Sequence, residues 1–165
     1  MLRLEAGGEV AQEALGGRIA AACPRACVIY LEGELGAGKT TLVRGFLRAL
    51  GHRGSVRSPT YTLLEPYELA TRNCYHLDLY RLADPSELEY LGVADLLASE
   101  AVLLVEWPDR GQGWLPPPDL LIRIEYQPEG RVVELIPESA VGGGADRRNI
   151  VLSVANRHGE RSEGG

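Results

Sequence analysis

The chain has 165 residues, of which 45% are hydrophobic and 24% are charged, and this size and composition suit a single globular domain. Its net charge of −6 argues against a protein that grips nucleic acid by itself, because such a protein needs a basic surface. The N-terminus turns polar at once, and no apolar run reaches the roughly 20 residues of a membrane span. We therefore expect no signal peptide and no membrane contact.

The three cysteines, Cys23, Cys27 and Cys74, indicate a reducing compartment. Their number is odd, and the C-x-x-x-C spacing of the first two lacks the second ligand pair that a zinc site needs. We expect unpaired thiols in a cytoplasmic protein.

The first third of the chain is typical of a helix, a strand, a loop and a second helix. Residues 26–31 form a continuous apolar run, as a buried parallel strand should. Residues 41–50 repeat apolar side chains at helical spacing, and Gly51 is a typical C-terminal stop. Residues 9–22 predict an amphipathic helix whose inner side comprises Val10, Ala14, Leu15, Ile19 and Ala22.

Between that strand and the second helix, the segment from Gly33 to Thr40 reads G-E-L-G-A-G-K-T, which matches the phosphate-binding P-loop G-x-x-x-x-G-K-[ST]. Lys39 is the single lysine of the chain, and every other basic side chain is an arginine. A lysine reaches phosphates as a compact point charge, whereas a planar guanidinium is too wide for such a loop. We expect the loop and the helix N-terminus to bind nucleotide phosphates through Leu35, Gly36, Ala37, Gly38, Lys39, Thr40 and Thr41.

The segment after this helix combines strands with short helices. Residues 61–69 and 74–79 predict a hairpin. Asp84 opens a helical region with the features of a capping box, and Gly92 divides it into two short helices that end near Ser99.

A second buried strand at residues 101–105 and a second hairpin at residues 120–126 and 131–136 complete the pattern. The predicted fold class is α/β: a single-domain P-loop NTPase fold with a mixed β-sheet flanked by helices and two hairpins.

Residues 1–138 are assigned to this P-loop domain. We expect residues 139–165, which are rich in glycine and arginine, to form a loosely held tail in which Ile150 to Val154 could make a short strand.

A P-loop needs Mg²⁺ and groups that hold it. Thr40 supplies one hydroxyl ligand, and Glu106 follows the second buried strand, where such proteins carry a carboxylate; the alternative is a surface glutamate at a strand end. Asp78 interrupts an otherwise apolar and aromatic strand, where a carboxylate is costly unless it is paired. Either Asp78 orients the attacking water or binds the metal through water, or it forms an ion pair with Arg81 or another arginine.

Three more side chains are candidates for the surroundings of the phosphates. Thr60 would reach the γ-phosphate or the metal as part of a switch segment, unless Pro59 merely sets a turn there. Trp107 either covers the nucleotide or simply packs. His76 is more typical of a structural hydrogen-bonding residue than of a catalytic base.

Four blocks together resemble the TsaE (formerly YjeE) family, bacterial P-loop ATPases needed for the threonylcarbamoyladenosine modification beside the tRNA anticodon. The P-loop is shared by very many proteins, but the other three blocks in this order and spacing are far more specific. The resemblance covers roughly residues 5–136, and its blocks are GELGAGKTT at 33–41, VRSPTYT at 56–62, YHLDLYRL at 75–82 and VEWP at 105–108.

The resemblance implies a protein that binds and hydrolyses ATP, with ATP and Mg²⁺ as its cofactors. It implies that Lys39, Thr40 and Thr41 bind the phosphates. Thr40 and Glu106 would ligate Mg²⁺, and Asp78 would support hydrolysis, so that Lys39, Asp78 and Glu106 are the catalytic candidates.

The resemblance also implies that residues 58–60 act as a switch and that Arg131, in the second hairpin, touches the nucleotide. In the family the ATPase docks on a TsaB–TsaD heterodimer and resets that complex between rounds. The tRNA would then be met only indirectly, through the partners, which agrees with the acidic charge.

Two other functions stay open on the residues alone. A small-molecule P-loop kinase would carry an arginine-rich lid and a phosphoacceptor-binding insert, and the segment between the P-loop helix and Glu106 has no clustered lid arginines. An ATP-binding switch with negligible turnover would share every motif.

Overall fold

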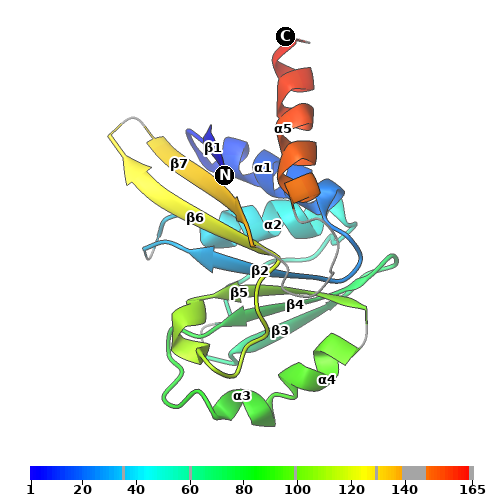
Figure 1. The fold of residues 1–165 in the computed structure, drawn as a ribbon, viewed down its shortest axis with the longest axis vertical. Coiled ribbons are helices and arrows are strands. Elements are labelled where there is room, and N and C mark those ends of the chain that lie inside the picture. The colour runs from blue at the N-terminus through cyan, green and yellow to red at the C-terminus, as the bar shows by residue number, and fades with distance from the viewer. Residues whose placement is uncertain (35, 60, 99, 129, 139–147, 164–165) are drawn as a thin grey trace.

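The computed structural model describes residues 1–34, 36–59, 61–98, 100–128, 130–138 and 148–163, and within these ranges a seven-stranded sheet carries helices on both faces (Figure 1). The strands are β1 (Leu2–Glu5), β2 (Cys27–Glu32), β3 (Leu64–Glu68), β4 (Asn73–Asp78), β5 (Ala101–Glu106), β6 (Leu120–Gln127) and β7 (Gly130–Pro137). The helices are α1 (Glu9–Ala22), α2 (Lys39–Ala49), α3 (Glu87–Tyr90), α4 (Val93–Ala98), the 3₁₀ turn η1 (Pro108–Gly111) and α5 (Arg148–Glu163).

The strand order is β1-β7-β6-β2-β5-β4-β3. The four central strands β6, β2, β5 and β4 run parallel, and the other three add antiparallel pairs at the two sides. The predicted α/β class with a mixed sheet and two hairpins, β3–β4 and β6–β7, is confirmed. Because parallel strands end at the same edge of a sheet, the last residues of β4 and β5, Asp78 and Glu106, lie opposite each other in register.

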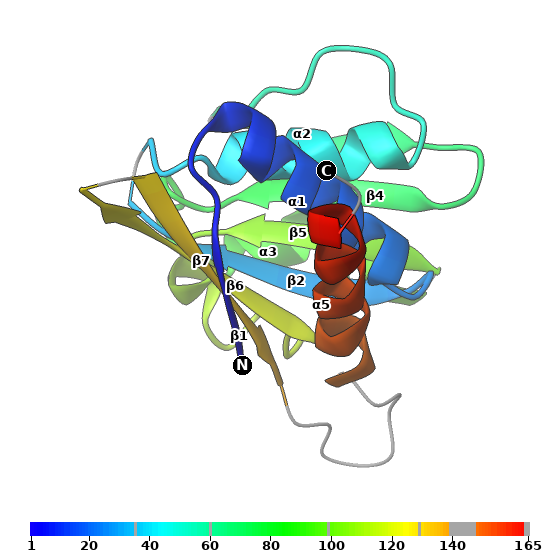
Figure 2. The same ribbon diagram turned by 90° about the horizontal axis from the view of Figure 1, so that it is seen from above.

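Each face of the sheet has its own apolar layer. On one face α1, α2 and α5 bury Ile19, Phe46 and Val154 against the strands, and Figure 2 shows these three helices over the sheet. On the other face α3 and α4 bury Leu88 and Val93. No helix in the described ranges has the length and apolar character needed to cross a bilayer.

The contact between α1 and α2 brings the two helices together backbone to backbone. A Cβ atom on Gly16 of α1 would lie 2.1 Å from the carbonyl oxygen of Leu42, and a Cβ atom on Gly45 of α2 would lie 1.9 Å from that of Glu13. Only glycine fits at both positions, because real Cβ atoms do not approach backbone oxygens so closely. This approach sets α1 directly over the start of α2.

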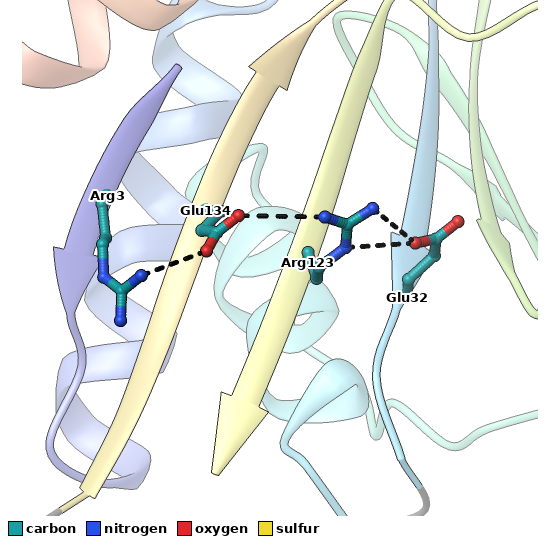
Figure 3. Close-up of polar contacts among 4 residues, drawn as sticks. All are labelled: Arg3, Glu32, Arg123 and Glu134. Atoms are coloured by element: carbon teal, nitrogen blue, oxygen red, sulfur yellow. Dashed lines mark hydrogen bonds and ion pairs between the residues drawn. The ribbon is translucent and has the colours of Figure 1, made fainter. Parts of the chain in front are cut away.

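The face of β1, β7, β6 and β2 away from α1 and α5 carries a row of alternating charges (Figure 3). Arg3 lies 3.4 Å from Glu134, Arg123 lies 3.9 Å from Glu134, and Arg123 also lies 3.4 Å from Glu32. Pairs of opposite charge suit directly opposed positions on neighbouring strands; Glu134 is buried at the centre of the row, whereas the two arginines are more exposed. The row gives this side of the sheet a hydrophilic surface.

One expectation about the C-terminal end of the chain is wrong, and one strand at the N-terminal end was not predicted. Residues 148–163 form the helix α5 rather than a short strand, and Ile150, Val151 and Val154 are buried against the core. Their spacing places them on one helical face. The N-terminal strand β1, in which Leu2 and Leu4 alternate with charged residues, pairs with β7. Residues 139–147 lie outside the described residues.

The burial pattern of α1 also departs from the prediction. Leu15 and Ile19 are buried as expected, but Val10 is 84% exposed, so its assignment to the inner side is wrong. Gln12 is fully buried in its place. The inner face of α1 therefore includes Gln12, Leu15, Gly16 and Ile19, and one of these side chains, Gln12, is polar.

Val154→Ala should lower the free energy of unfolding by about 2 kcal/mol, because it opens a cavity where α5 meets the core. The matched control is Leu152→Ala on the same helix; Leu152 is 59% exposed, so its loss should cost less than about 0.5 kcal/mol. Urea denaturation measures both values. Equally small effects would contradict the docking of α5.

Candidate functional site

A cavity of about 600 Å³ opens at the edge of the sheet where the parallel strands end. The loop between β2 and α2 forms one wall, and the ends of β4 and β5 form another. Its lining comprises Glu9, Gly36, Gly38, Lys39, Thr40, Thr41, Ser58, Asp78, Tyr80, Arg81, Glu106, Trp107 and Arg131.

The backbone of the β2–α2 loop turns sharply into the helix. Gly36 and Gly38 have φ angles of +79° and +101°, a region that glycine enters without strain. The N-terminus of α2, which begins at Lys39, then faces the cavity with Thr40 and Thr41. Backbone N–H groups at a helix start, aided by the helix dipole, favour a phosphate at this position.

Lys39 is buried in this wall, with 5% of its surface exposed. Its Nζ donates to the Gly33 carbonyl at 2.5 Å and lies 4.1 Å from the centre of the Trp107 ring. Burial lowers the pKa of the ammonium group, and the carboxylates of Glu106 and Asp78 oppose that shift. The cation therefore sits between an aromatic face and two carboxylates at the mouth of the loop.

Glu106 is buried, with 3% exposure, and it is not the surface glutamate of the alternative interpretation. Its Oε2 lies 2.6 Å from Nε2 of the fully buried His76. A carboxylate can only accept here, so the imidazole donates. His76 is thus a structural hydrogen-bonding partner, as expected, and it orients the carboxylate at the end of β5.

Asp78 uses both carboxylate oxygens within the described structure. Oδ2 accepts from the Ser58 hydroxyl at 2.5 Å, and Oδ1 accepts from the Tyr80 amide at 3.0 Å. Arg81, the predicted ion-pair alternative, instead lies over the ring of Tyr61 at 5.0 Å. Asp78 thereby ties the segment before residue 60 to the end of β4.

Trp107 follows Glu106 in a left-handed conformation, with a φ of 57°, which is uncommon for a large side chain. Its ring covers Lys39, and the ring of Tyr80 lies 5.1 Å away, tilted by 50°. The indole therefore belongs to the cavity wall.

Two side chains hold the outer side of the loop, and one of them had not been predicted. Arg131 donates to the Gly36 carbonyl at 3.3 Å and to Oε1 of Gln12 at 3.4 Å. Gln12 in turn donates to the Ala37 carbonyl at 3.2 Å. Gln12 lies three and four residues before Leu15 and Gly16, and this helical spacing is the sequence signal that places it on the inner face of α1.

Most of the predicted site residues meet at this cavity: Gly36, Gly38, Lys39, Thr40, Thr41, Asp78, Glu106, Trp107 and Arg131. Ala37 is different, because its side chain is buried and its N–H donates to the Glu34 carbonyl at 3.0 Å inside the loop. Leu35 and Thr60 lie outside the described residues.

The donor set fits Mg²⁺ shared with a phosphate better than a metal held by protein alone. Among the described residues, no group of three His, Cys, Asp or Glu side chains converges as a ligand set. Mg²⁺ is commonly bound through one or two carboxylates together with substrate phosphates and water. Thr40 and Glu106, which both line the cavity, suit that arrangement.

Comparison with known proteins places the chain in a family. The family model described as "Threonylcarbamoyl adenosine biosynthesis protein TsaE" matches residues 8–133. A tRNA threonylcarbamoyladenosine biosynthesis protein TsaE from Haemophilus influenzae is 48% identical over 132 residues, 80% of each chain. The protein of the same name from Bacillus subtilis is 39% identical over 131 residues, 79% of this chain and 78% of the relative.

A solved structure agrees with the sequence matches. The crystal structure of Bacillus subtilis YdiB superposes with a TM-score of 0.78 at 26% identity, covering 95% of each chain. The match of a seven-stranded α/β domain therefore extends over nearly the whole chain. On the family model and on these relatives, the chain belongs to the TsaE family of tRNA threonylcarbamoyladenosine biosynthesis proteins.

Proposed function

We propose that this protein binds Mg-ATP and hydrolyses it in support of tRNA threonylcarbamoyladenosine biosynthesis. One observation carries the proposal: buried Lys39 faces the paired strand ends Asp78 and Glu106 across a single cavity. The P-loop supplies a cation and backbone N–H groups for phosphates, and the opposite wall supplies carboxylates. Phosphoryl transfer depends mainly on such positioning and electrostatic stabilisation.

Each side chain has a definite task in this proposal. Lys39 would contact the β- and γ-phosphates, and Thr40 and Glu106 would hold Mg²⁺. When bound, Mg²⁺ neutralises the charge that develops on the transferred phosphoryl group. Asp78 orients the attacking water, and Trp107 limits access of bulk water to the phosphates.

The bond between Ser58 and Asp78 supports a switch. Ser58 lies in the segment that joins α2 to β3, and its hydroxyl bonds to a proposed catalytic carboxylate. A ligand that takes over Asp78 would release this segment, as in switches that respond to a γ-phosphate. Residues 58–60, with Thr60 as a γ-phosphate or metal contact, are the proposed switch.

We propose that the switch changes conformation when the protein docks on a TsaB–TsaD complex in the cytoplasm, and that these partners bind the tRNA. Cys23, Cys27 and Cys74 are buried and are not in disulfide bonds, which suits a reducing compartment. The isolated chain should hydrolyse ATP slowly, because docking completes the catalytic geometry.

The test of this function combines Lys39→Arg with the partners. The parent should turn over ATP faster when TsaB and TsaD from the same organism are added. Lys39→Arg should lose roughly 100-fold in turnover and should not respond, because a guanidinium cannot fit beneath Trp107 and still reach two phosphates. Phosphate release and the modification of tRNA in a reconstituted assay measure both effects.

The matched control is Arg48→Lys, an exposed charge-conserving exchange on the same helix, which should behave as the parent. Fast turnover by the isolated chain with no response to partners would contradict the proposal. So would a Lys39→Arg protein that still supports modification. Transfer of phosphate to a metabolite, instead of its release, would identify a kinase.

Glu106→Gln should reduce hydrolysis by roughly 100-fold and the affinity for ATP by less than about tenfold, because metal charge matters most in the transition state. Single-turnover hydrolysis and calorimetry measure the two quantities. Glu125→Gln, an exposed carboxylate on β6, is the control that should change neither. Equal losses of binding and hydrolysis in Glu106→Gln would refute its metal role.

Nucleotide should change the emission of Trp107, because its ring lies over Lys39. The measurement uses Trp114→Phe, which removes the second tryptophan of the chain. A fluorescence titration with Mg-ATP should saturate in that variant. An unchanged spectrum at saturating nucleotide would place Trp107 away from the bound phosphates.

A further inference from the structure

We infer that Gln12 is a positioning residue that holds the P-loop in its phosphate-binding shape. The inference rests on the proposed nucleotide binding, but it concerns the loop before any ligand arrives. Gln12 belongs to none of the motifs of the site and comes from α1, a helix that precedes the P-loop strand.

Gln12 reaches the loop because α1 lies directly against α2. The contacts at Gly16 and Gly45 remove the space that side chains would need between the two helices. One turn before Gly16, Gln12 is then level with the start of α2, and its side chain is fully buried. A buried amide is costly unless its polar atoms are paired.

Both ends of this amide are paired, and each partner matters for the loop. Nε2 donates to the Ala37 carbonyl at 3.2 Å, and Oε1 accepts from Arg131 at 3.4 Å. The first bond turns one loop carbonyl toward α1. The second ties the amide to the β6–β7 hairpin, so that Gln12 connects three separate segments.

The amide also fills the place that a side chain at position 38 would occupy. A Cβ atom on Gly38 would lie 1.9 Å from Oε1 and 2.7 Å from Cδ of Gln12. The glycine of the motif and the glutamine are therefore complementary in shape. Gly38 needs its φ of +101°, and the amide packs against the backbone in that conformation.

The carbonyl group of Gly36, next to that of Ala37, also accepts hydrogen bonds, in this case from the β6–β7 hairpin. The Tyr126 hydroxyl and Nη2 of Arg131 both donate to the Gly36 oxygen, and the guanidinium lies 5.2 Å from the Tyr126 ring. Two successive carbonyls, those of Gly36 and Ala37, thus face donors outside the phosphate position. Carbonyl oxygens repel phosphate, so turning them outward leaves the loop ready to present N–H groups.

Gln12→Met keeps the length and approximate volume of the side chain but removes its hydrogen bonds. In the nucleotide-free protein, amide hydrogen exchange of the loop peptide should rise roughly tenfold, and the Kd for Mg-ATP should rise roughly five- to tenfold, the size of one or two lost hydrogen bonds. Gln12→Glu keeps the acceptor for Arg131 but directs a second oxygen at the Ala37 carbonyl. Its loop should exchange at least as fast as that of Gln12→Met.

Ile19→Val is the matched control, because Ile19 is fully buried on the same helix and has no bond to the loop. It should lower the melting temperature while leaving loop exchange and Kd unchanged. Unchanged exchange in Gln12→Met, or equal changes in Ile19→Val, would overturn the inference. Exchange is read without ligand, so a parent chain that failed to bind ATP would refute the proposed function and leave the loop result to decide the role of Gln12.

Discussion

The close approach of α1 and α2 is the constraint on which the site depends. Gly16 and Gly45 allow the two backbones to touch. This contact fixes the position of the start of α2 relative to α1. The P-loop is then supported from outside by Gln12 and Arg131. A loop that must offer N–H groups to a phosphate is stable only if its carbonyl groups have partners elsewhere.

The second constraint is the parallel centre of the sheet. Because β2, β5 and β4 all end at one edge, the P-loop and two carboxylates far apart in the sequence come within reach of one cavity. Glu106 and Asp78 are buried there at an energetic cost, and each is paired by a hydrogen bond, from His76 and from Ser58 respectively. These partners orient groups that the proposed reaction needs, which is why the structural and functional roles of the two strand ends are hard to separate.

Much of the fold could be predicted because its signals are local. Apolar runs identified β2 and β5, glycine and proline marked the turns, and the P-loop motif located the start of α2. The errors fall where packing decides. Ile150, Val151 and Val154 suit a short strand or a helix equally well by composition, and only contact with the core selected α5. Val10 is apolar, which favours burial, but its position on α1 is exposed.

The sequence alone determined the elements that need only neighbouring residues: the P-loop with its single lysine, the buried strands, and the blocks that mark the TsaE family. Only the tertiary structure decided the partners of the site residues. It joined Glu106 to His76, paired Asp78 with Ser58 where an arginine had been one of the alternatives, and added Gln12. Hydrogen bonds between distant segments depend on strand register and helix packing, and the spacing of residues along the sequence predicts neither of them.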